Sequence, residues 1–84
     1  MEKLGIGLCK DGYYEGWDKK GIASQEACNV LCLSEKQCKF AAWMPKKTCS
    51  RYTGAICYLQ TATAYQRLHT TFEKKSSGIL QTFH

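Results

Sequence analysis

The sequence has no long apolar runs. No apolar stretch approaches the roughly 18 residues that a membrane-spanning helix needs, so we expect no transmembrane segment. The first residues, Met1 to Leu4, lead into a glycine-rich stretch instead of an apolar one, so a secretory signal peptide is not indicated. Together with the cysteine content below, this favours a module taken from a larger secreted parent protein.

Patterns that mark catalysis or nucleic-acid binding are also scarce. There are no paired carboxylates at useful spacing, no nucleophile motif and no phosphate-binding loop, so we expect neither an enzyme nor a cofactor. His69 is the only internal histidine, and a lone histidine among threonines is typical of a surface or half-buried strand position. No run of basic residues is longer than two, and no nucleic-acid motif occurs, so a nucleic-acid partner is not expected.

Cysteine, in contrast, is abundant. A chain of 84 residues holds six cysteines, and a domain this small buries only about 60% of the surface of its unfolded chain. The spacing is C-x3-C followed by C-x5-C, without the paired C-x2-C units of zinc sites, so we expect no metal. Three disulfides in a single secreted domain are the better interpretation.

The charge is unevenly distributed. Residues 1–42 carry six lysines and six acidic residues, whereas residues 43–84 carry six basic residues against Glu73 alone. The whole net charge of +5 therefore belongs to the second half. Such asymmetry indicates a surface that attracts anions, or simply a solvated face that aids solubility.

The local signals predict one helix and several strands. Ser24 is a good N-cap, and Glu26 suits the positive end of a helix dipole, so we expect a helix over about residues 25–35. An apolar strand is expected over 38–44, a polar loop over 46–54 and a second strand over 55–60, forming a hairpin with a long connection. Threonines and aromatics favour extended structure over 61–72, and 79–80 would be a last short strand. One helix against a small antiparallel sheet is an α+β module.

The helix signals also bear on the cysteines. Cys28 and Cys32 are four residues apart and would share one helix face. Their Cβ atoms would lie about 5–6 Å apart, too far for a direct bond. We therefore expect them to join the helix to two different strands. Phe40, Trp43 and Leu59 are assigned to the core.

Several motifs follow one another in a recognisable order. They are Cys9 with Tyr-Glu-Gly-Trp-Asp at 14–18, then Ser24 and a helix-borne Cys28-x3-Cys32 leading through Cys38-Lys39-Phe40 to Trp43, then Cys57-Tyr58-Leu59, and finally Ser77-Gly78. In order and spacing they resemble the PAN/apple domain family. The resemblance covers about residues 9–80, which would form one module, with 1–8 and 81–84 as flanking tails. Residues 1–8 would be a tail or a first edge of the sheet.

The resemblance implies a five-stranded antiparallel sheet that cradles one helix, and two disulfides. Cys28 would pair with Cys57, and Cys32 with Cys38. In full apple domains the first cysteine pairs with one near the C-terminus, but nothing beyond Cys57 can serve here. By elimination Cys9 would pair with the additional Cys49, a link with no counterpart in the family.

Family members occur in clotting-related proteases, plasminogen-like growth factors and adhesins of apicomplexan parasites, including microneme-type adhesins. They are non-catalytic modules of secreted multidomain proteins. The resemblance therefore implies an extracellular or secretory-organelle adhesion module, in tandem with others, that attaches to a glycan or protein on a host-cell surface. The alternative is docking or assembly within a protease or adhesin complex, which predicts an exposed apolar patch.

Two surfaces are candidates for a glycan. A basic group could hold the sulfates or carboxylates of an acidic polysaccharide; it comprises Lys46, Lys47, Arg51, Arg67, Lys74 and Lys75. An aromatic group could stack on a sugar ring, with one carboxylate to accept hydroxyl protons; it comprises Tyr13, Tyr14, Trp17 and Asp18. For Tyr14 and Trp17, packing against the sheet is the alternative.

Overall fold

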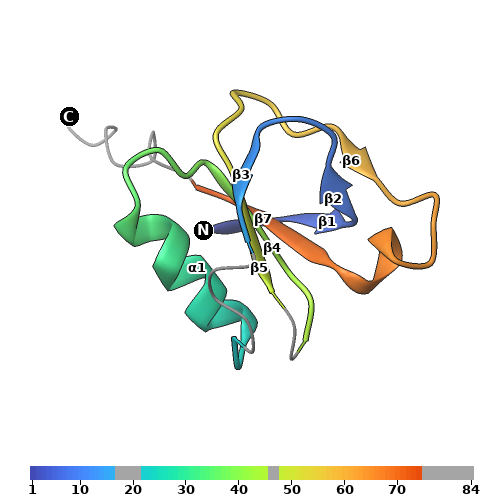
Figure 1. The fold of residues 1–84 in the computed structure, drawn as a ribbon, viewed down its shortest axis with the longest axis horizontal. Coiled ribbons are helices and arrows are strands. Elements are labelled where there is room, and N and C mark those ends of the chain that lie inside the picture. Colours follow the sequence, from blue (N-terminus) through green and yellow to red (C-terminus); the bar gives the residue numbers. More distant parts are fainter. Residues whose placement is uncertain (17–21, 46–47, 75–84) are drawn as a thin grey trace.

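A computed structural model describes residues 1–16, 22–45 and 48–74 of the chain. Within these ranges there are one α-helix, one turn of 3-10 helix and seven strands (Figure 1). In chain order they are β1 Glu2–Ile6, β2 Leu8–Cys9, β3 Tyr13–Glu15, α1 Gln25–Ser34, β4 Phe40–Trp43, β5 Cys49–Tyr52, β6 Leu59–Gln60, η1 Gln66–Leu68 and β7 Thr70–Glu73. None of the described helices is long and apolar enough to cross a membrane.

Five of the strands form one antiparallel sheet in the order β1-β7-β4-β5-β3. The helix α1 packs on one face, and the short ribbon β2-β6 lies away from it on the other side of the sheet (Figure 1). The α+β fold with one helix on a five-stranded antiparallel sheet is therefore confirmed. Residues Glu2–Ile6 pair with β7, so the first residues are an edge strand and not a flanking tail.

The two faces follow from strand alternation, because successive side chains of a strand point to opposite sides. Ala41 packs with the helical cysteines, whereas its neighbours Phe40 and Ala42 pack on the opposite face, with Tyr52 of β5 and with Cys9 of the β2-β6 ribbon. Phe40 is buried as expected, and Trp43 and Leu59 are half-buried. The sheet is thus a central layer between α1 and an outer layer, which contains the β2-β6 ribbon.

The helix begins and ends where the sequence predicts. The Ser24 hydroxyl accepts a hydrogen bond from the Ala27 backbone N–H at 3.0 Å, and Glu35 is the C-cap. The Trp43 indole N–H donates to the Ile22 carbonyl at 3.0 Å, and this bond holds the segment just before α1 against β4.

The prediction for residues 46–60 is wrong in two places. Cys49–Tyr52 is not loop but strand β5, paired with β4 from Phe40↔Tyr52 to Trp43↔Cys49. The predicted strand over 55–60 shrinks to the two residues of β6, which pair with β2. Extended structure over 61–72 is confirmed only for β7, because η1 interrupts it. The predicted strand at 79–80 and the tail 81–84 lie outside the described residues.

Two of the three expected disulfides are also wrong. Cys32–Cys38 is confirmed, but Cys28 pairs with Cys49, and Cys9 pairs with Cys57. The reason is the layering of the fold. Cys49 lies on the helix face of the sheet with Cys28, whereas Cys57 belongs to the outer layer with Cys9. The sheet therefore separates Cys28 from Cys57.

Glycine is needed where the chain passes from β1 to β2. Gly7 has a φ of 125°, and a Cβ there would lie 2.5 Å from the Gln60 carbonyl oxygen and from Thr61 Cγ2. No other residue fits this close approach without moving the backbone. The crossing from the main sheet to the outer layer thus depends on Gly7.

Candidate functional site

The basic candidates do not form one surface in the described part of the chain. Arg51 lies on β5 with its side chain 0% exposed, so the prediction that it contacts a ligand is wrong. Arg67 is exposed on η1, where its Nη1 donates to the carbonyls of Thr61 and Ala62 at 2.9 and 3.1 Å. Lys46, Lys47 and Lys75 lie outside the described residues.

Arg51 and the remaining basic candidate, Lys74, both bind Glu35. Arg51 Nη1 lies 3.2 Å from Glu35 Oε2, and Lys74 Nζ donates to the Glu35 backbone carbonyl at 3.1 Å. The Tyr14 hydroxyl donates to Glu35 Oε1 at 2.5 Å. Glu35 therefore joins the end of α1 to β3, to β5 and to the residue after β7, which is a structural role.

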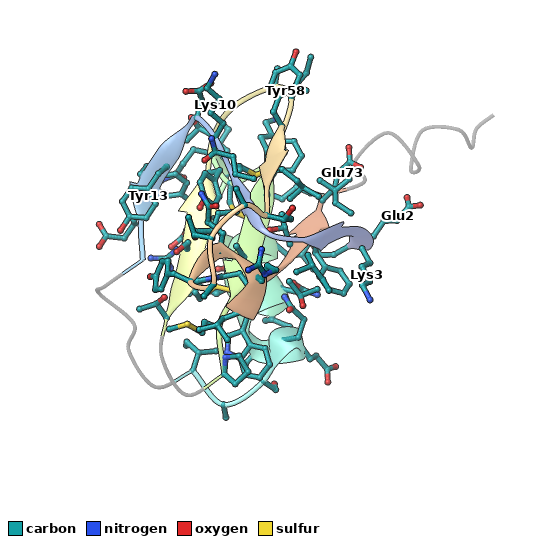
Figure 2. All side chains as sticks on the ribbon, turned by 90° about the vertical axis from the view of Figure 1, so that its right-hand side faces the viewer. Glu2, Lys3, Lys10, Tyr13, Tyr58 and Glu73 are labelled. Atoms are coloured by element: carbon teal, nitrogen blue, oxygen red, sulfur yellow. A yellow bond between two sulfur atoms is a disulfide. The ribbon has the colours of Figure 1, made fainter. Side chains whose placement is uncertain are left out.

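The aromatic candidates are divided as well. Tyr13 and Tyr14 are neighbours on β3, so their side chains leave opposite faces of the sheet. Tyr14 packs on the helix face as the alternative interpretation expected, whereas Tyr13 is exposed at the edge of the molecule (Figure 2). The Tyr13 ring meets the Tyr52 ring edge-on at 5.9 Å. Trp17 and Asp18 lie outside the described residues.

Several large apolar side chains are instead exposed, and they fall into groups. On the outer face of α1, Val30 is 57% and Leu33 is 52% exposed. At one end of the molecule, Tyr58 lies beside Lys10, whose backbone N–H donates to the Tyr58 carbonyl at 3.0 Å (Figure 2). A third group lies around η1 and comes from two distant parts of the chain.

We name this third group the η1 patch, which consists of Ile6, Tyr65 and Leu68. Tyr65 and Leu68 are three residues apart at the 3-10 turn, and this spacing places side chains on one side of such a helix. Ile6 pairs with Thr70, and the next residue, Gly7, donates its N–H to the His69 carbonyl at 2.9 Å. Ile6 is 51% and Leu68 is 57% exposed. The fold thus places β1 beside η1, and both elements expose apolar side chains there.

Sequence reasoning missed this surface. Leu68 and Tyr65 lie in a threonine-rich stretch that indicated only extended structure, and Ile6 lies in the supposed tail. The pairing of β1 with β7, which joins them, is a contact between the two ends of the described chain. The sequence did contain one indication of such a surface: it has large apolar residues that the predicted core did not include.

His69 lies beneath the η1 patch and is only 1% exposed, so the prediction of a surface or half-buried position is wrong. Its Nδ1 lies 3.0 Å from the Tyr65 carbonyl, and its ring meets the Tyr65 ring at 4.9 Å. Burial lowers the pKa of His69 from its ordinary value, against the opposing effect of the hydrogen bonds that His69 makes with the backbone of Tyr65 and Gln66. No group of histidine, cysteine and carboxylate side chains that could hold a metal occurs among the described residues.

Comparison with known proteins found no matching family, no similar curated protein and no similar solved structure.

Proposed function

We propose that this chain is a non-catalytic recognition module of a secreted protein, of the PAN/apple type that its motifs resemble. It works in tandem with other modules, and its partner is a protein on a cell surface. The three disulfides, which stabilise such small domains outside the reducing cytosol, support the extracellular setting.

The observation that carries the choice of a protein partner is the η1 patch. A docking module is expected to expose apolar side chains, and two of the patch residues, Ile6 and Leu68, are more than half exposed. A glycan site would need basic or aromatic groups together. Among the described candidates, Arg51 and Tyr14 instead point into the interior, where both bind Glu35.

The same contacts support a non-catalytic role. The Glu35 carboxylate is occupied by Arg51 and Tyr14, and the His69 imidazole is covered by the outer layer. Groups held in this way stabilise a fold and are not open to a substrate.

The test uses the oxidised module displayed as a tetramer, with binding to intact animal cells measured by flow cytometry. We expect binding to be lost after the cells are treated with protease, and to survive removal of sialic acid and of sulfated glycans. In the module, Ile6→Asp with Leu68→Asp should abolish binding. The matched control is Val30→Asp with Leu33→Asp, which alters side chains of similar exposure on α1.

Three outcomes would contradict the proposal. Loss of binding in the helix-face control alone would place the contact on α1. Binding that falls as salt rises and that a glycan array reproduces would favour an acidic glycan and the lysines. Elution above 9.5 kDa on size exclusion, abolished by the η1-patch variant, would show that the patch joins copies of this chain.

A further inference from the structure

The outer layer contains a long stretch with no buried residue. Tyr52 and His69 are both buried, and every residue from 53 to 68 between them is exposed or half-buried. The Cys9–Cys57 disulfide holds the start of this stretch, and the chain has no cysteine beyond Cys57. His69 is therefore the residue that anchors its other end to the sheet.

Three hydrogen bonds to backbone groups hold His69 in place, two within its own segment and one to the residue after β1. Its N–H donates to the Gln66 carbonyl at 3.3 Å, its carbonyl accepts from Gly7 N–H at 2.9 Å, and its Nδ1 faces the Tyr65 carbonyl. Since a carbonyl only accepts, Nδ1 carries the proton. The other ring nitrogen, Nε2, is buried and has no hydrogen-bond partner in the part of the chain that the structure describes.

Among the described residues around the ring, none supplies a charge that would balance an imidazolium. From η1 and its cap, Tyr65 meets the ring, and the Arg67 guanidinium is bound to the Thr61 and Ala62 carbonyls. From β1 the neighbour is Gly7, and from β7 it is Thr71, whose hydroxyl donates to the Gly7 carbonyl at 2.5 Å. Burial is the main cause of the lowered pKa of His69, and no charged side chain is among its causes.

We propose that His69 is an acid-sensitive latch that holds residues 61–69 on the sheet. Protonation at Nε2 would place a donor and a positive charge where residues 1–16, 22–45 and 48–74 supply no acceptor, and such a group is costly to bury. Opening of 61–69 lets water reach Nε2 while the disulfides hold the rest of the fold. Because Tyr65 and Leu68 lie in this segment, the opening dismantles the η1 patch.

The direction of the pH effect follows from the lowered pKa. The unfolded or opened segment binds a proton below about pH 6.5, whereas the closed form resists protonation until a lower pH. The stability of the closed form is therefore fully present above pH 6.5 and is lost as the pH falls from there through the pKa of the closed form.

The test is amide hydrogen exchange on the oxidised module at pH 7.5 and pH 5.0, corrected for the intrinsic pH dependence of exchange. We expect residues 61–69 to lose protection by about tenfold or more at pH 5.0, while β4 and β5 keep theirs. His69→Asn, whose amide can still donate toward the Tyr65 carbonyl, should abolish the pH dependence. His84→Gln is the control for the second histidine and should leave it intact.

A direct titration keeps the test valid if His69→Asn does not fold. In the unaltered module, the His69 imidazole signal in NMR spectra should titrate below its ordinary value and in step with the opening of 61–69. Unchanged protection at pH 5.0, or titration at the ordinary value without opening, would overturn the latch.

Regulation of binding by this latch rests on the proposed function, but the opening itself does not. If both are right, cell binding is lost at pH 5.0, returns at pH 7.5, and persists at pH 5.0 in His69→Asn. If exchange shows the opening but the η1-patch variant still binds cells, the latch stands and the proposed function fails.

Discussion

Arg51 and Glu35 form an ion pair, at 3.2 Å, between the inner strand β5 and the end of α1. The Arg51 side chain is 0% exposed and that of Glu35 is 26% exposed. A charge buried this deeply needs a partner, and Glu35 also accepts from the Tyr14 hydroxyl. The pair thus holds the C-terminal end of α1 against β5. It also explains why a basic residue occupies a buried strand.

Glu35→Gln should destabilise the fold strongly, because it removes the charge that Glu35 places against the buried guanidinium. We expect a loss of about 3 kcal/mol in the free energy of unfolding, measured by urea denaturation with the disulfides intact. Glu26→Gln is the control, since Glu26 is exposed in the first turn of α1 and its loss should cost less than about 1 kcal/mol. Equal effects of the two changes would show that Arg51 does not depend on Glu35.

The disulfide pattern predicts an order of stabilisation. Cys9–Cys57 spans 48 residues and Cys32–Cys38 spans 6. Closing the longer loop removes more freedom from the unfolded chain, about 4 kcal/mol against about 2 kcal/mol. Replacing Cys9 and Cys57 together by serine should therefore lower the free energy of unfolding more than replacing Cys32 and Cys38. The opposite order would mean that native contacts, and not loop closure, dominate.

The pairing itself can be read from a tryptic digest under non-reducing conditions. Cleavage at lysine and arginine separates the cysteines into peptides 4–10, 21–36, 37–39, 48–51 and 52–67. The observed disulfides predict peptide 4–10 joined to 52–67, and a three-peptide species of 21–36, 37–39 and 48–51. Detection of 4–10 joined to 48–51 would instead support the pairing that elimination suggested.

Gly7→Ala should unfold the junction between β1 and β2. The left-handed backbone and the contact with Gln60 together should cost about 3 kcal/mol. Gly54→Ala is the matched control, because the nearest atom to a Cβ there is 3.5 Å away, an ordinary contact. Thermal unfolding should show a large drop in Tm for the first variant and little change for the second. A similar Tm for both would mean that the outer layer can shift to admit the methyl group.

Local signals predicted the elements that local physics controls. The Ser24 cap and Glu26 fixed the start of α1, and the apolar run at 40–43 indicated β4. The family resemblance supplied the five-stranded sheet and the short Cys32–Cys38 link. These features depend on neighbours in sequence or on motifs of fixed spacing.

The remainder depends on contacts between distant residues. Cys49-Ser-Arg-Tyr is polar enough to resemble a loop, yet it forms a core strand in which distant Glu35 pairs with Arg51 and Cys28 bonds to Cys49. The choice between Cys49 and Cys57 as the partner of Cys28 depends on which face of the sheet each one occupies. The η1 patch requires β1 beside β7. None of these relationships leaves a periodic pattern in the sequence.

Tyr52 limits the stability of the fold at high pH. Burial raises the pKa of Tyr52 to about 12, and the effect exceeds the opposing hydrogen bond with Ser50. The unfolded phenol ionises near pH 10, so the folded form binds the proton more tightly between these values. The stability that Tyr52 contributes is therefore full below pH 10 and is lost as the pH rises toward 12. In a pH titration followed by tyrosinate absorbance, the last ionisation step should belong to Tyr52 and should disappear in Tyr52→Phe. That variant should also unfold at a higher pH. If Tyr52→Phe instead lowers the absorbance by the same fraction at every pH, the assignment is contradicted.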